Sequence, residues 1–339
     1  MMQYLSCEAN DGCTLAFQSS LPLPAANGPT SPEADPRYCK ILLLLHGFSG
    51  SSAYFSRNFA QLSRDFWVVA LDLRGHGASG RTRGGYHVAR LAADVRDLVG
   101  HLHRALHATT NPAERGAEPL VVPVGCSIGA AVLWTYVELF GQHGLGGFVF
   151  VDQAPLQDRV PGFVGGSGGE CGWGADRAHL GCYDEASLLA AQRAWIETPD
   201  AAHRGLVEGC LGYRVRPLEG EETGAEYARK KAEDEAFFVG ESRRCDGVWL
   251  ARLLADHTRY DHREAIEGIR VPALVLAGRR TGCFPLEGME ETARRVRKGN
   301  GGREEAAEWV VFESGHWLFW EESERFNEVV GGFARKCMA

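Results

Sequence analysis

The sequence of 339 residues has no long hydrophobic run and no excess of basic residues. Its longest apolar stretch, around residues 41–45, is far shorter than the about 20 residues that a membrane-spanning helix needs. Residues 1–10 lack the basic-then-apolar plan of a secretion signal. We therefore expect a cytoplasmic protein with no membrane partner. A formal net charge of -8 leaves no basic surface for nucleic acid, which we also exclude as a partner.

The ten cysteines are scattered, and no two of them form a C-x-x-C motif. In a reducing compartment this pattern predicts free, mostly buried thiols. His103 and His107 share one face of a predicted helix at a spacing that can bind metal, but no acidic or cysteine partner completes a site there. The Asp256-His257 and Asp261-His262 pairs are interpreted in the same way. We predict no metal site and no cofactor.

Hydrophobic residues make up 45% of the chain and charged residues 24%, a balance typical of packed globular proteins. Buried-strand patterns alternate with helical patterns along the first half of the chain, which predicts an α/β fold with a mostly parallel, doubly wound sheet. A hairpin at residues 3–9 and 14–19 precedes this alternation. Pro123 lies inside one predicted strand, where we expect a local bulge. The predicted strands are 40–45, 66–71, 120–124 and 148–151, and the helices between them are 51–62, 86–106 and 130–140.

The alternation breaks after residue 151. A glycine-rich stretch and polar helical segments follow, with more aromatic residues than a solvated linker needs. We predict a helical lid at residues 156–264, inserted between two parts of one core at 1–155 and 265–339. Strands at 271–277 and 309–312 and helices at 287–298 and 322–335 resume the core. The tryptophans expected to contact the substrate are Trp173, Trp195, Trp249 and Trp317.

The strongest chemical signal is Gly125-Cys126-Ser127-Ile128-Gly129, a G-x-S-x-G motif between a predicted strand and a predicted helix. A serine on such a sharp turn presents its hydroxyl above the sheet, so Ser127 is the candidate nucleophile. The backbone N–H of Ile128 lies at a helix N-terminus, where developing negative charge is stabilised. Ile128 is therefore one candidate donor of an oxyanion hole.

The His46-Gly47-Phe48 segment follows the strand that ends at residue 45. Its loop is expected at the carboxyl edge of the sheet, where ligands bind in doubly wound folds. We assign the backbone N–H of Phe48 as the second oxyanion donor. The alternative interpretation of this segment is a glycine turn that closes a strand, which is less favoured here because the Ser127 turn is also present.

Four motifs occur in an order that resembles the α/β-hydrolase superfamily over nearly the whole chain outside the lid. The resemblance implies an α/β-hydrolase fold, with Ser127 as nucleophile and His316 as general base. It also explains the G-x-G-x-x-G spacing of Gly75, Gly77 and Gly80, which no helix follows, so we predict no dinucleotide site. The motifs are His46-Gly47, residues 73–79, the Ser127 turn and Ser314-Gly315-His316.

The catalytic acid departs from the usual pattern of this superfamily. The acid normally follows the strand predicted at residues 271–277, but Thr281 stands in the expected place. An alternative within the superfamily places the acid one strand earlier, where this chain has Asp152. We therefore assign Asp152 the task of orienting His316 and stabilising the imidazolium ion. Weaker candidates by position are Asp256, Asp261 and Glu313.

These residues predict a serine hydrolase that cleaves a carboxylic ester or lactone through an acyl-enzyme. The aromatic lid suggests an uncharged, fairly large, ring-containing small molecule as substrate and partner. The acid position, the turn and the lid resemble fungal-type lactonases that act on polyketide macrolactones. Two alternatives stay open: a cofactor-independent dioxygenase of the same fold, and a small-molecule receptor without turnover.

Overall fold

The computed structural model describes residues 3–24, 35–108, 119–157, 183–218 and 224–339. These residues contain an eight-stranded sheet in the order β1-β2-β4-β3-β5-β6-β7-β8. β1 and β2 form the predicted antiparallel hairpin, β2 is also antiparallel to β4, and every later neighbouring pair is parallel. The strands are β1 (Gln3–Glu8), β2 (Thr14–Ser19), β3 (Lys40–Leu45), β4 (Trp67–Leu71), β5 (Leu120–Cys126), β6 (Phe148–Val151), β7 (Ala273–Gly278) and β8 (Ala307–Phe312).

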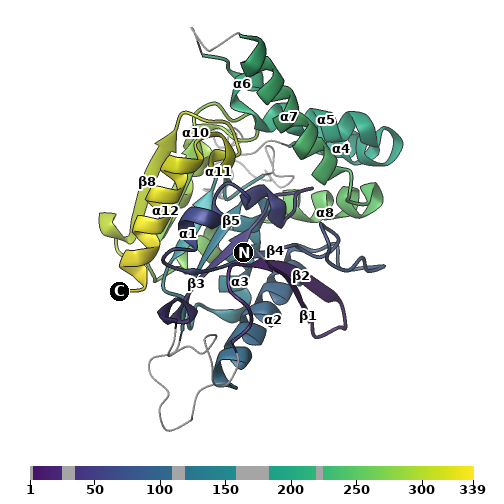
Figure 1. The fold of residues 1–339 in the computed structure, drawn as a ribbon. Coiled ribbons are helices and arrows are strands. Elements are labelled where there is room, and N and C mark those ends of the chain that lie inside the picture. The colour runs from purple at the N-terminus through teal and green to yellow at the C-terminus, as the bar shows by residue number, and fades with distance from the viewer. Residues whose placement is uncertain (1–2, 25–34, 109–118, 158–182, 219–223) are drawn as a thin grey trace, which may run out of the picture.

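The apolar run of β3 is buried on both faces of the sheet. Ile41 and Leu43 belong to one hydrophobic core, whereas Leu42 and Leu44 belong to the other. Burying each such side chain stabilises the fold by about 1.5–3 kcal/mol. The predicted doubly wound sheet is confirmed, with helices on both faces (Figure 1). The first core includes residues of α2 (Val88–His107), α3 (Ile128–Phe140), α9 (Arg263–Glu267) and α10 (Leu286–Gly299), and the second includes residues of α1 (Phe59–Leu62), α11 (Leu318–Glu321) and α12 (Ser323–Cys337).

In the described chain six helices lie between β6 and β7, and the first five of them gather at one end of the sheet (Figure 1). The first of them begins with a capping box, in which the Asp184 carboxylate accepts a 2.8 Å hydrogen bond from the Ser187 backbone N–H. Phe238 of the fourth stacks on Trp317 of the core with ring centroids 3.7 Å apart, which fixes that helix to the core. These inserted helices are α4 (Glu185–Glu197), α5 (Pro199–Cys210), α6 (Gly212–Val215), α7 (Ala225–Ser242) and α8 (Gly247–Arg259).

The helix predicted at residues 51–62 is instead two short pieces. A 3₁₀ turn, η2 (Ser52–Phe55), is capped by Ser51 and is followed by α1. The break coincides with Asn58, whose side-chain amide donates to the Phe319 carbonyl at 3.0 Å and to Asn327 Oδ1 at 2.9 Å. These tertiary bonds of a buried polar side chain outweigh the local helical pattern.

Pro123 lies inside β5, opposite Leu43 of β3. The residues before and after it also pair regularly with β3. Val121 directs its backbone N–H and C=O to Gly144 and Gly146. Because alternate residues of a parallel strand turn their peptide groups to the same side, Pro123 faces that side too, ahead of the first β6 pairing at Val124. On that side the pairing shifts by one residue, from Val121 with Leu145 to Val124 with Val149. The segment opposite Pro123 therefore carries one extra residue, and the expected local bulge lies in this segment.

None of the helices in the described part of the chain combines the length and the apolar character required to cross a bilayer. The described cysteines are free thiols, and most of them are buried.

Candidate active site

Ser127 occupies the turn between β5 and α3 with backbone angles φ 53° and ψ -124°. This left-handed conformation is strained for a residue with a side chain and is held by the surrounding packing. A Cβ added to Gly125 would lie 2.5 Å from the backbone of Gly129, and one added to Gly129 would lie 2.7 Å from the Leu45 carbonyl oxygen. The two glycines therefore let β5, α3 and the end of β3 meet closely enough to form the turn.

Replacing Gly129 by alanine should lower the free energy of unfolding by about 1–3 kcal/mol, because the new methyl group meets rigid backbone. Urea unfolding followed by tryptophan fluorescence measures this difference. Gly240→Ala is the matched control, since nothing lies within 4 Å of its added Cβ in α7. Equal stability of the Gly129→Ala and Gly240→Ala variants would show that the turn tolerates a side chain.

Asp152 and His316 form a buried pair although 164 residues separate them. The imidazole Nδ1–H donates to Asp152 Oδ2 at 2.5 Å. Asp152 itself has φ 50° at the end of β6, and its Oδ1 accepts a 2.7 Å bond from the Gly278 backbone N–H. The backbone N–H of His316 donates to the Cys210 carbonyl at 2.7 Å. The acid and the imidazole are thus fixed from both the sheet and an inserted helix.

The other candidate acids are engaged elsewhere. Asp256 accepts a 2.8 Å bond from the backbone N–H at the start of α2. Asp261 pairs with Arg263 at 3.0 Å, and Glu313 pairs with Arg279 at 2.8 Å. Thr281, in the position usual for the acid, accepts a 3.2 Å bond from the backbone N–H of Cys283.

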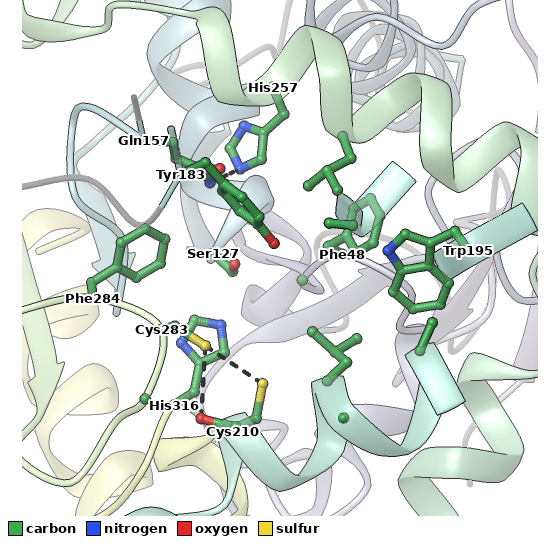
Figure 2. A pocket seen from close by; sticks show the side chains of 18 of the residues that line it. Phe48, Ser127, Gln157, Tyr183, Trp195, Cys210, His257, Cys283, Phe284 and His316 are labelled. Atoms are coloured by element: carbon green, nitrogen blue, oxygen red, sulfur yellow. Dashed lines mark hydrogen bonds between the residues drawn. The ribbon is translucent and has the colours of Figure 1, made fainter. Parts of the chain in front are cut away.

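A cavity of about 380 Å³ joins Ser127 and His316, whose side chains both line it (Figure 2). Its volume lies within the range of small-molecule sites. Among the described residues that line it, none is aspartate, glutamate, lysine or arginine. The larger apolar side chains of the wall are Phe48, Trp195, Leu206, Leu254, Phe284 and Trp317.

Gln157, Tyr183 and His257 add a polar section to the cavity wall (Figure 2). The side-chain amide of Gln157 is hydrogen-bonded to Nε2 of His257. Burial lowers the pKa of His257 to about 3, so its ring is neutral near pH 7. This section offers hydrogen bonds without a charge. It could not be predicted from the sequence, because no motif links residues so far apart.

The four tryptophans expected at the substrate have different positions. Trp195 and Trp317 line the cavity, and Trp173 lies outside the described residues. Trp249 is absent from the described wall. Its ring instead packs against Gly75, where an added Cβ would lie 2.9 Å away, and against Tyr86 at a centroid distance of 5.4 Å. Trp249 therefore anchors α8 on the loop after β4.

The backbone N–H groups of Phe48 and Ile128 are the predicted oxyanion donors. Ile128 begins α3, so its N–H has no acceptor within the helix. The N–H of Phe48 has no protein acceptor among the described residues. A Cβ on Gly47 would lie 3.2 Å from Ser127 Cβ, which places this loop directly against the candidate nucleophile.

Two buried histidines from the sequence motifs accept hydrogen bonds from the backbone of the loops around the site. His46 Nε2 accepts a 3.0 Å bond from the Leu73 backbone N–H, and His76 Nε2 accepts a 3.2 Å bond from that of Ser49. Burial lowers their pKa values, to about 4 for His46 and about 3 for His76. Both rings are thus neutral and act as fixed hydrogen-bond partners.

Cys283 lies beside His316 in the same cavity, and its Sγ is 3.7 Å from that of Cys210. Burial lowers the pKa of His316, but the neighbouring Cys283 and the hydrogen bond to Asp152 outweigh this effect and raise it to about 10. The hydrogen bond from Cys210 and the charge of His316 hold the pKa of Cys283 well below its usual value. The two side chains thus shift each other's pKa in opposite directions, upward for His316 and downward for Cys283.

The amino-acid sequence of this chain is similar to those of known proteins. The sequence model described as the alpha/beta hydrolase fold matches residues 40–323. An AB hydrolase superfamily protein of Bacillus subtilis (strain 168), YisY, is 22% identical over 310 residues, which cover 86% of this chain and 91% of that protein.

Solved structures show the same fold. An esterase from Exiguobacterium antarcticum superimposes with a TM-score of 0.70 at 17% identity, over 99% of this chain and 100% of the esterase. An enol-lactonase from Burkholderia xenovorans LB400 gives a TM-score of 0.66 at 16% identity, over 97% of this chain and 99% of the lactonase. At these identities the likeness shows the architecture and leaves the substrate open.

Proposed function

The chain belongs to the α/β-hydrolase family, and we propose that it is a serine hydrolase that cleaves the carboxylic ester or lactone bond of an uncharged, largely apolar small molecule. One observation carries the proposal: the strained Ser127 turn and the buried Asp152–His316 pair open into the same cavity. A nucleophile, a base and a group that orients the base are the parts that acyl transfer requires.

In the proposed reaction, Ser127 Oγ attacks the carbonyl carbon while Nε2 of neutral His316 takes the hydroxyl proton. This transfer needs the two atoms to approach within about 2.6–3.2 Å of each other. The N–H groups of Phe48 and Ile128 stabilise the oxyanion, and Asp152 stabilises the imidazolium ion. The alcohol leaves with the proton from His316, and water then repeats the sequence to release the acid and restore Ser127.

The cavity wall supports the substrate class. A substrate with a charged group would lose its hydration in a space whose described wall carries no lysine, arginine, aspartate or glutamate. The aromatic rings of Trp195, Phe284 and Trp317 favour a ring-bearing apolar molecule. The esterase and enol-lactonase among the structural neighbours act, by their names, on bonds of the proposed type.

A fluorophosphonate probe followed by peptide mass spectrometry tests the proposed nucleophile directly, since it should label Ser127. A panel of neutral aryl esters, macrocyclic lactones and their carboxylate-bearing analogues then tests the substrate class. We expect the neutral compounds to be cleaved faster. Oxygen uptake with a hydroxylated heteroaromatic ring, without ester cleavage, would favour the dioxygenase alternative, and stoichiometric labelling without turnover would favour a receptor.

The rate should depend on pH through His316. A general base acts in its neutral form, so kcat/KM should rise with pH until the pKa of about 10 is passed. Cys283→Ser removes a neighbour that raises the pKa of His316, so this pKa should fall and the rise of kcat/KM should move to lower pH. Profiles of kcat/KM from pH 6 to 10.5 measure the shift.

Cys245→Ser is the matched control for this shift, because Cys245 is buried among the inserted helices and does not line the cavity. Its profile should coincide with that of the unsubstituted enzyme. An unchanged pH profile in Cys283→Ser would show that Cys283 does not raise the pKa of His316.

A further inference from the structure

Two cysteines and the candidate base converge at one wall of the cavity (Figure 2). Cys210 comes from the end of α5, Cys283 from the loop after β7, and His316 from the loop after β8. One potential ligand atom from each of the three lies within 4.8 Å of the others. Of these three residues, only His316 takes part in the chemical steps of the proposed hydrolysis.

The distance between the two sulfur atoms fits one metal ion that is bound by both of them. Thiolates bound at about 2.3 Å to a tetrahedral zinc ion are about 3.8 Å apart, whereas the sulfur atoms of a disulfide are about 2.05 Å apart. The observed Sγ–Sγ distance is 3.7 Å. The free thiols therefore already have the spacing of two metal ligands.

His316 is oriented as a ligand. Its Nδ1–H is held by Asp152 at 2.5 Å, which leaves Nε2 as the available nitrogen. Metal-binding histidines characteristically donate their other N–H to a carboxylate in this way, which fixes the ring and raises its basicity. The cavity beside the three residues leaves a fourth position for water, as in zinc sites with two cysteines and one histidine.

The backbone around the cluster is already fixed. His316 donates its backbone N–H to the Cys210 carbonyl at 2.7 Å, and the N–H of Gly282 donates to the Gly209 carbonyl at 3.1 Å. These bonds tie the end of α5 to both ligand-bearing loops. A metal ion would therefore bind without ordering a mobile segment, and little affinity would be lost to reorganisation.

We propose that Cys210 Sγ, Cys283 Sγ and His316 Nε2 bind one thiophilic divalent ion of the zinc class, and that this ion inhibits the enzyme. Inhibition, unlike binding, rests on the proposed function: the metal occupies the nitrogen that must accept the Ser127 proton. The ion binds the thiolate form of each cysteine and the unprotonated Nε2, so each of these atoms gives up any proton that it carries to solvent.

Titration of reduced, metal-free, full-length protein with Co²⁺ tests the site without substrate. We expect a thiolate-to-cobalt absorption band that saturates at one equivalent and is removed by Zn²⁺. Cys210→Ser and Cys283→Ser should each weaken Co²⁺ binding at least tenfold. Cys39→Ser, which alters an exposed cysteine outside the cavity, should leave the titration unchanged. The ester hydrolysis of the unsubstituted enzyme should fall with Zn²⁺ at the same midpoint and return with a chelator.

These experiments test the proposed metal site independently of the proposed hydrolase activity. Absence of the band would overturn the metal site and leave the hydrolase proposal intact. Co²⁺ binding by both cavity variants that is as tight as binding by the unsubstituted protein would do the same. Full ester turnover by the zinc-saturated enzyme would overturn the inhibition. Failure of metal-free protein to label Ser127 or to cleave any ester would instead count against the proposed function, whatever the cobalt spectrum shows.

Discussion

Ser127→Ala should lower kcat for ester cleavage by about 10⁶-fold, because removal of the nucleophile disables the whole catalytic unit. The free energy of unfolding should change little, because the substitution removes only one hydroxyl group and the residues around Ser127 hold the turn in place. The Ser127 backbone N–H donates to the Val151 carbonyl at 2.9 Å, and this bond should persist because it does not involve the side chain. Steady-state hydrolysis of an aryl ester and urea unfolding measure the two quantities.

Cys126→Ala is the matched control, because it changes the buried residue next to Ser127 on the same turn. We expect this variant to keep the fluorophosphonate label that Ser127→Ala loses. Cleavage that survives in Ser127→Ala but disappears in Cys283→Ala would identify Cys283 as the nucleophile, since its sulfur lies beside the same imidazole.

Asp152→Asn should lower kcat by about 10⁴-fold while the fold persists. The amide matches the carboxylate in shape, but it carries no charge to stabilise the imidazolium ion and can favour the wrong tautomer of His316. The 2.5 Å bond from His316 Nδ1 and the 2.7 Å bond from the Gly278 N–H show how completely this buried carboxylate is engaged. Kinetics with a reactive aryl ester, together with a circular-dichroism spectrum, measure the loss.

Asp256→Asn makes the same chemical change at a carboxylate that caps α2 and does not line the cavity. Its kcat should stay within a few-fold of the unsubstituted enzyme, although its stability should fall slightly with the weaker cap. A larger loss of kcat in Asp256→Asn than in Asp152→Asn would identify Asp256, on the inserted helix α8, as the catalytic acid.

Several sequence expectations remain predictions. The oxyanion roles of Phe48 and Ile128, the lid at residues 156–264, the small-molecule partner and the cytoplasmic location each depend on experiments of this kind. The absence of a cofactor also stays an expectation.

The core of the fold could be predicted because its signals are local. The unbroken apolar run of β3 identifies a strand buried on both faces, and the glycines around Ser127 identify a turn between a strand and a helix. The prediction of one continuous helix at residues 51–62 was wrong. The Asn58 side chain makes hydrogen bonds to Phe319 and Asn327, more than 250 residues away in the chain. No local pattern contains that information.

The sequence by itself determined the sheet, the strained serine and, through motif order, the choice of Asp152 and His316. Only the tertiary structure decided which side chains share the cavity. It placed Trp249 against Gly75 and brought Cys210 and Cys283 beside His316. The physical reason is that strand and turn formation depends on neighbouring residues, whereas the composition of a cavity depends on where separate loops meet at the edge of the sheet.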